Sequence, residues 1–294
     1  MFKNSNGQVR AGWLILFAFI AVFIGQGILT AGGYSLLYLL NAPGTNSSYE
    51  GVPFTIADLY PWNSFVIYGG AEIGTILFTI LIWCFVNKKP LHQLGIKWVG
   101  KDALFGFLLG TLSISMLFLI LFATGLVELR SSLASPSFSI YTLITFLFYI
   151  LVGVSEEIFF RGYIMSTMQE RGNPKWLIYL VSAIIFSLMH GLNPNISVLG
   201  IINIALVGLL FAYMFSVTKN LWLPIGYHIA WNYFQGSIFG FAVSGTEPRS
   251  IYDPIVSNNH DWITGGTFGL EGGILTTLIL IIGYVVTRIY MKFR

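Results

Sequence analysis

The stretch Glu156-Glu-Ile-Phe-Phe-Arg161 decides the fold, because it places three charges directly after the uncharged apolar run 139–155. A charge near the centre of a membrane helix costs roughly 2.5–3.5 kcal/mol on insertion scales, so such groups usually face a bundle interior and pair with a neighbour. Glu157 and Arg161 are four residues apart, so on a helix they share a face and can neutralise each other. Glu156 points about 100° away from Glu157 and has no local partner.

The composition is that of a membrane protein. Only 9% of the 294 residues are charged, 55% are hydrophobic, and the mean hydropathy is +0.77. Soluble domains carry about 25% charged residues. The chain is therefore predicted to cross a bilayer several times. Its single cysteine, Cys84, excludes an intramolecular disulfide and a cysteine-based metal site.

Eight apolar segments are long enough to cross a bilayer, and Gly, Pro and polar residues separate them. The predicted spans are 11–40, 64–86, 103–124, 139 to about 169, 176–190, 196–217, 221–241 and 273–291. Segments 41–63, 87–101, 125–138 and 242–272 are predicted loops. Within two spans, glycines four residues apart predict close contact with another helix: Gly70 with Gly74, and Gly106 with Gly110.

The distribution of positive charge supports this map and orients it. Of the fifteen Lys and Arg residues, all but Arg130 and Arg249 fall on the side of the two termini. Positive residues concentrate in cytoplasmic loops. The prediction is an all-α, polytopic membrane helical bundle of about eight transmembrane helices, with both termini cytoplasmic. It forms a single membrane domain over residues 1–294 and lies in the cell membrane as a multi-pass protein.

Two further polar groups interrupt the apolar spans after Glu156. His190 ends the fifth predicted span, and His228 and Asn232 share one helical face of the seventh. Glu156 lies about thirteen residues from the helix end near Gln169, and His190 a similar number from the helix start, so at ~1.5 Å per residue both are roughly 20 Å from the inner surface. These two side chains can therefore meet. His228 is only a few residues into its span, so either an inserted entry segment precedes it or the boundary at 221 is misplaced.

These residue types allow several chemistries. A carboxylate in a low-dielectric site and a histidine can activate water, and a second imidazole with an amide can stabilise an oxyanion, which suits amide hydrolysis. Glu156, His190 and His228 can also supply three metal ligands and leave one position for water. No HExxH helix is present, which excludes a zincin arrangement. Glu72, in the second span, adds a third possibility, a proton-coupled transporter using Glu72, Glu156 and His190.

Each feature also has a structural explanation. A histidine in a membrane helix commonly serves as an interhelical hydrogen bonder, and Glu157 with Arg161 suits a structural ion pair. The purely structural explanation weakens when Glu156, His190, His228 and Asn232 occur together in nearby spans. From the residues alone, an enzyme and a transporter explain them equally well.

The ordered set Glu-Glu-x-x-x-Arg, Phe-x-x-x-His and His-x-x-x-Asn resembles the CPBP intramembrane proteases, which include CAAX prenyl endopeptidases and bacteriocin-processing (Abi) proteins. The motifs stand at Glu156 to Arg161, Phe186 to His190 and His228 to Asn232, and the resemblance covers about 151–232. It marks 139–241 as a catalytic core that follows the N-terminal helices of 11–124.

The resemblance implies roles for these residues. Glu156 is expected to be the general base that activates water, assisted by His190, while His228 and Asn232 stabilise the oxyanion. Glu157, held by Arg161, orients the site. A divalent metal such as zinc is one expectation, on Glu156, His190 and His228, and a metal-free glutamate protease is the other. The expected partners are membrane lipid and a hydrophobic or lipidated peptide or protein substrate, with no nucleic acid. A non-catalytic bacteriocin self-immunity protein is a further alternative.

Overall fold

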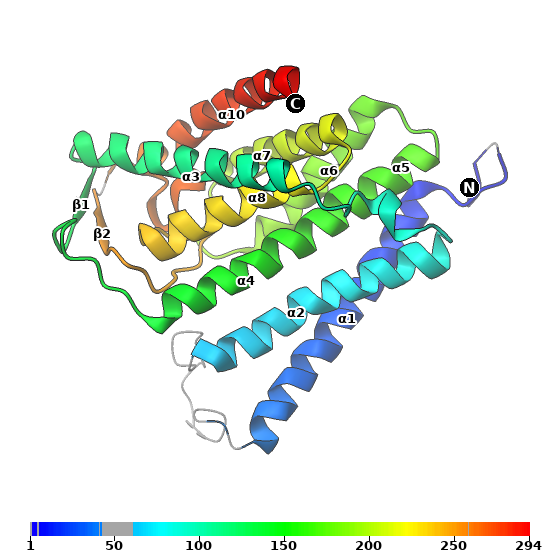
Figure 1. Ribbon diagram of the computed structural model, residues 1–294, viewed down its shortest axis with the longest axis horizontal. Helices are drawn as coiled ribbons and strands as arrows, with labels where there is room; N and C mark the ends of the chain where they lie inside the picture. Colours follow the sequence, from blue (N-terminus) through cyan, green and yellow to red (C-terminus); the bar gives the residue numbers. More distant parts are fainter. Residues whose placement is uncertain (1, 5, 41, 43–60, 258) are drawn as a thin grey trace.

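The computed structural model describes residues 2–4, 6–40, 42, 61–257 and 259–294, and most of these lie in helices (Figure 1). Most of the predicted loop 41–63 lies outside the described residues. The helices are α1 (Ala11–Leu39), α2 (Pro61–Leu81), α3 (Gly100–Ala123), α4 (Ile140–Glu157), α5 (Ser166–Glu170), α6 (Lys175–Met189), α7 (Val198–Thr218), α8 (Trp222–Asn232), α9 (Asp261–Thr264) and α10 (Ile274–Phe293). This confirms the predicted polytopic helical membrane fold.

Short elements complete the chain. The 3₁₀ turns are η3 (Leu91–Leu94), η5 (His190–Leu192), η7 (Gly266–Phe268) and η8 (Leu270–Gly272). One antiparallel pair, β1 (Val127–Leu129) and β2 (Pro254–Val256), has Val127 opposite Val256. The predicted loop 242–272 therefore contains β2, α9 and two 3₁₀ turns. β1 and β2 join this segment to the loop that follows α3 (Figure 1).

Seven helical stretches of the described chain are long and apolar enough to cross a bilayer: 11–39, 62–86, 100–123, 140–170, 175–192, 198–218 and 274–293. They correspond to seven of the eight predicted spans and support a multi-pass membrane protein. The predicted span 221–241 differs. It forms the eleven residues of α8 followed by six residues of the π-helical turn η6 (Tyr233–Ile238), and every residue from Leu223 to Asn232 is buried. This segment is apolar because protein surrounds it.

Two other helices also change pitch. The π-helical turn η2 (Ile82–Val86) ends the α2 stretch, and η4 (Ile158–Met165) joins α4 to α5. The stretch from Ile140 to Glu170 is therefore continuous, as its sequence predicted. It ends because Gly172 adopts φ +76° and Pro174, which follows, cannot continue a helix. π-Helical turns occur frequently at functional sites, and η4 contains Arg161.

α8 lies inside the bundle, where it packs along α3, while α1 packs along α2 and α6 along α7 (Figure 1). Its entry is fixed by two hydrogen bonds. The Leu221 amide donates to the Gly95 carbonyl oxygen at 2.9 Å, and the Trp222 indole donates to the Ile96 carbonyl oxygen at 3.1 Å. Asn220 and Leu221 are buried, so α8 begins within the protein. His228 therefore lies deep in the bundle although it is near the start of its predicted span. This agrees with the predicted segment that leads the chain into the bundle before His228.

Glycine allows α3 to approach α8 closely, which gives a stability prediction. A Cβ at Gly110 would lie 2.5 Å from the Tyr227 carbonyl oxygen and 3.0 Å from the Ala230 Cβ. Overpacking of this kind costs about 1–3 kcal/mol. We expect Gly110→Ala to lower the thermal unfolding midpoint of the detergent-purified protein. The matched control is Gly27→Ala in α1, whose added Cβ meets no atom within 4 Å. Equal midpoints for the two variants would contradict the packing argument.

Candidate active site

A fully buried ion pair forms the base of the site. Arg161 Nη1 donates to Glu157 Oε1 at 2.7 Å, and both side chains have no exposed surface. The same guanidinium donates to the Gly208 carbonyl oxygen of α7 at 3.3 Å. It also lies 4.3 Å from the centre of the Phe186 ring on α6. The predicted pairing is confirmed, and it links three helices that surround the site.

His228 lies between the two adjacent carboxylates. Its Nδ1 lies 3.2 Å from Glu157 Oε1, and its Nε2 lies 3.8 Å from Glu156 Oε2. Glu157 is held as a carboxylate by Arg161, and a carboxylate only accepts hydrogen bonds, so we assign the proton to His228 Nδ1. The other nitrogen then faces Glu156. A carboxylate that orients an imidazole in this way fixes its tautomer.

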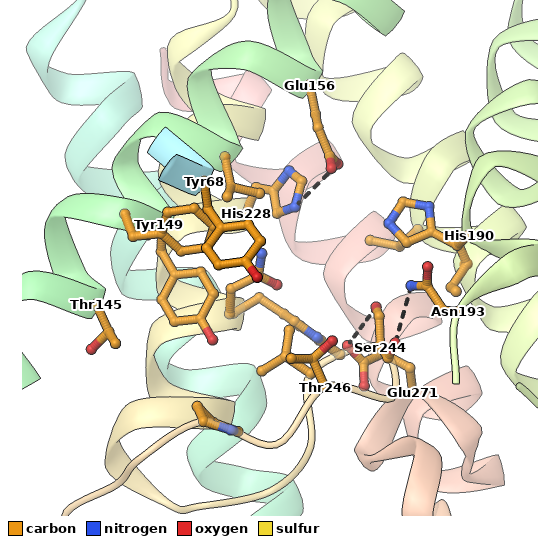
Figure 2. A pocket seen from close by; sticks show the side chains of 18 of the residues that line it. Tyr68, Thr145, Tyr149, Glu156, His190, Asn193, His228, Ser244, Thr246 and Glu271 are labelled. Atoms are coloured by element: carbon orange, nitrogen blue, oxygen red, sulfur yellow. Dashed lines mark hydrogen bonds and ion pairs between the residues drawn. The ribbon is translucent and has the colours of Figure 1, made fainter. Parts of the chain in front are cut away.

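Glu156 points into the cavity from the last turn of α4 (Figure 2). Its side chain is 24% exposed, compared with none for Glu157. Within the described residues, Glu156 Oε2 is buried and makes no hydrogen bond. A carboxylate oxygen that lacks a protein donor but lines a cavity is suited to accept a hydrogen bond from a water molecule or a substrate. This agrees with its predicted lack of a local partner.

His190 faces the cavity from the opposite wall (Figure 2). α6 ends at Met189, and the His190 Nδ1 lies 2.9 Å from the Phe186 carbonyl oxygen. A carbonyl oxygen only accepts, so Nδ1 carries the proton and Nε2 is left for the cavity. Asn232, the last residue of α8, lines the same cavity one helical turn after His228, as their four-residue spacing predicted.

All four predicted catalytic residues, Glu156, His190, His228 and Asn232, line one cavity of about 410 Å³. Its walls are mainly apolar and aromatic, with rings from α2, α4, α6, α7 and α8. Ligand sites typically combine such walls with a few convergent polar groups.

Sequence reasoning missed a second polar group in this cavity. Glu271, which was assigned to a loop, is buried and lines the cavity opposite Glu156 (Figure 2). It hydrogen-bonds Gln235, while the Asn193 amide donates to the Ser244 carbonyl oxygen at 3.0 Å. Burial raises the pKa of the Glu271 carboxyl to about 7, and the Gln235 hydrogen bond opposes this shift. In the sequence, the signal that could have indicated this burial is that Glu271 lies between glycines, just before an apolar span.

Glu72 lies behind the site. Its carboxyl is hydrogen-bonded to the hydroxyl of Ser155, the residue before Glu156. The same hydroxyl lies 3.0 Å from the Val152 carbonyl oxygen. Glu72 is not among the residues that line the cavity. It therefore tethers α2 to α4.

The predicted metal ligands do not form a metal-binding group. Within the described residues, no three His, Cys, Asp or Glu side chains are placed so that they could hold one ion. His190 lies across the cavity from Glu156 and His228, so the three side chains line one cavity but do not meet around a single ion-sized point (Figure 2). The residues present therefore do not fit a three-ligand zinc site, and we derive no step through a metal.

The apolar helices and the buried acid–histidine cluster define a multi-pass membrane protein with a mainly apolar cavity inside its bundle, into which a few polar side chains point. Residues 137–234, about a third of the chain, match the family model described as type II CAAX prenyl endopeptidase Rce1-like. The match confirms the predicted resemblance to the CAAX proteases, and it supports a CAAX-type intramembrane endopeptidase, which is a hydrolase. Comparisons with curated proteins and with solved structures give no significant match.

Proposed function

We propose that this protein hydrolyses a peptide bond of a hydrophobic or lipidated substrate held in the cavity, with Glu156 as the general base. The observation that carries the proposal is the convergence of Glu156, His190, His228 and Asn232 on one cavity. The buried pair Glu157–Arg161 holds His228 in place from behind. The match of 137–234 to the CAAX endopeptidase model supports the same reaction class.

The distance between Glu156 and His228 suits the activation of water. Two acceptor atoms 3.8 Å apart can both lie within hydrogen-bonding distance of one water molecule. Glu156 takes a proton from this water as its oxygen attacks the carbonyl carbon of the substrate. His190, on the opposite wall, assists by orienting the water or the substrate carbonyl through its free Nε2.

The tetrahedral intermediate is stabilised by donors on α8. The Asn232 amide donates to the oxyanion, and His228 does so once its Nε2 has received from Glu156 the proton that was taken from water. Glu157 contacts the other ring nitrogen and so keeps the imidazole oriented toward Glu156. When the C–N bond breaks, the proton taken from water passes to the leaving amine. The products are one carboxylic acid and one amine, which ionise to a carboxylate and an ammonium group, so atoms and charges balance.

The decisive experiment is cleavage by the purified full-length chain. The protein in detergent is incubated with hydrophobic peptides, with and without a prenyl group, in water enriched in oxygen-18. We expect an internal cut and one heavy oxygen in the new carboxyl group, as mass spectrometry would record. A folded protein that cuts no peptide of the panel would argue against the proposal.

The role of Asn232 gives a separate prediction. Loss of one oxyanion donor typically reduces kcat by about 10²–10³-fold. We expect Asn232→Ala to show this loss with little change in KM, because the donor acts on the charge that develops in the transition state. Asn173→Ala, which removes an asparagine from the loop before α6, is the matched control and should keep its activity. A variant Asn232→Ala that loses only substrate affinity would assign the residue to binding.

The transporter alternative receives less support. It requires Glu72 to share a pathway with Glu156 and His190, but Glu72 bonds Ser155 and does not line the cavity. Proton-linked flux of a substrate in proteoliposomes that depends on Glu72 would restore this alternative. A self-immunity role without catalysis would instead survive the substitution Glu156→Gln.

A further inference from the structure

The cavity lies toward one end of the bundle. It is lined by residues in the first half of α2 and α10, along the length of α4, from the first turns to the middle of α7, near the end of α6, in the second half of α8, and in segment 243–249. Within the described chain, the last turns of α2, α7 and α10 and the first turns of α6 contribute no lining residue. We call the end that carries segment 243–249 the open end, and the end that carries the loop between α2 and α3 the closed end.

Side chains fill the closed end. The fully buried Tyr163 lies in η4, two residues after Arg161 and six after Glu157, and donates to the Leu14 carbonyl oxygen at 3.2 Å. Nearer the surface, Asp102 of α3 accepts hydrogen bonds from Asn220 at 2.6 Å, from Tyr290 at 2.7 Å and from Arg294 at 2.9 Å. These contacts tie α3, α10 and the entry to α8 together. Within the described residues, packed side chains therefore separate Glu156 from the closed end.

The two ends differ sharply in charge. Among the described residues, the Lys and Arg side chains lie at the closed end or in the helical turns next to it. The exceptions are Arg130, Arg249 and the buried Arg161. Arg130 is paired with Asp253 at 2.7 Å, which leaves the open end with little excess positive charge. Because Lys and Arg concentrate in cytoplasmic loops, the closed end is assigned to the cytoplasm.

We propose that the cavity receives its substrate from the non-cytoplasmic side of the membrane. The substrate is then an apolar peptide segment that has been exported, or that leaves the membrane on that side. Five aromatic side chains, Phe65, Tyr68, Tyr141, Phe148 and Tyr149, line the route from the open end toward Glu156 and suit such a segment. Cleavage of this segment rests on the proposed function, but the direction of access does not.

Labelling of cysteines tests the direction of access without any need for activity. Cys84, a free cysteine and the only one in the sequence, is first replaced by serine. Thr246→Cys and Glu247→Cys then introduce a thiol at exposed cavity-lining positions, and Lys97→Cys introduces one at an exposed closed-end position. Each protein is treated with a membrane-impermeant maleimide in right-side-out and in inside-out membrane vesicles.

The expected result is modification of Thr246→Cys and Glu247→Cys only in right-side-out vesicles, and of Lys97→Cys only in inside-out vesicles. The reverse pattern would overturn the proposal. So would open-end thiols that react in detergent but not in right-side-out vesicles, since the cavity mouth would then be inaccessible from that side. Neither outcome depends on catalysis.

A cleavage assay with the same vesicles tests the substrate. A water-soluble peptide with an apolar core is added outside, and its products are measured by mass spectrometry. We expect cleavage in right-side-out vesicles and its loss in inside-out vesicles, with the Glu156→Gln protein inactive in both. Cleavage confined to inside-out vesicles would refute the proposed side. Correct labelling without cleavage in detergent or in either vesicle type would instead count against the hydrolase function.

Discussion

Glu156→Gln is expected to reduce kcat for peptide cleavage by roughly 10²–10⁴-fold, the range that general-base catalysis usually supplies. Glutamine has the same shape, so it preserves the cavity and can still hydrogen-bond a water molecule. It cannot take the proton of that water. Because Glu156 Oε2 makes no hydrogen bond within the described residues, the substitution breaks no existing hydrogen bond at that oxygen. The thermal unfolding midpoint should therefore change little.

The measurement is kcat and KM on the peptide that the wild-type protein cuts best, with unfolding followed in the same detergent. Glu170→Gln is the matched control, since Glu170 pairs with Lys89 at 3.0 Å, away from the cavity. It should retain near wild-type kcat. A Glu156→Gln protein with more than a small residual kcat would assign the base to another group, and His228 Nε2, 3.8 Å away, is the nearest candidate.

Arg161→Met is expected to be the most destabilising single change that we describe. The substitution keeps an apolar side chain among Phe186 and Phe211 but leaves Glu157 buried without its cation. Removing one partner of a buried ion pair typically costs about 3–5 kcal/mol. A large fall in the unfolding midpoint in detergent would report this loss. The exposed arginine near the end of α10 provides the control, and Arg288→Met should have little effect.

The double variant Glu157→Gln, Arg161→Met separates charge from packing. Replacing both members of a buried pair is often close to neutral, because no uncompensated charge is left. We therefore expect the double variant to recover much of the lost stability. It should not recover activity, since the carboxylate that orients His228 Nδ1 is gone. A double variant less stable than the sum of its single changes would contradict the ion-pair explanation.

Much of the fold could be predicted because membrane helices are encoded by long apolar runs. The pairing of Glu157 with Arg161 followed from their four-residue spacing alone. The common location of Glu156, His190, His228 and Asn232 followed from counting residues along helices and from the family resemblance. Their roles in catalysis are still predictions.

Other features had no local signal. Hydropathy does not distinguish a helix surrounded by protein from one surrounded by lipid, so α8 was predicted as a longer span. Glu271 was placed in a loop because a charged residue between glycines usually contacts solvent, yet the fold buries it. The separation of His190 from Glu156 and His228 depends on the packing of α6 against α7, which periodicity does not determine. For that reason Glu156, His190 and His228 do not form one group of metal ligands among the described residues.

The π-helical turn η4 allows one continuous stretch to serve two sets of neighbours. α4, before the turn, packs against α2 and α8, whereas α5, after it, packs against α1 and α6. An α-helix rotates by about 100° per residue, so the loss of one residue within η4 would swing one set of side chains away from its partners. The number of residues in η4 thus sets the rotation of the helix on either side of it. Deletion of even one residue there would displace either Glu156 and Glu157 or the packed side chains of the closed end.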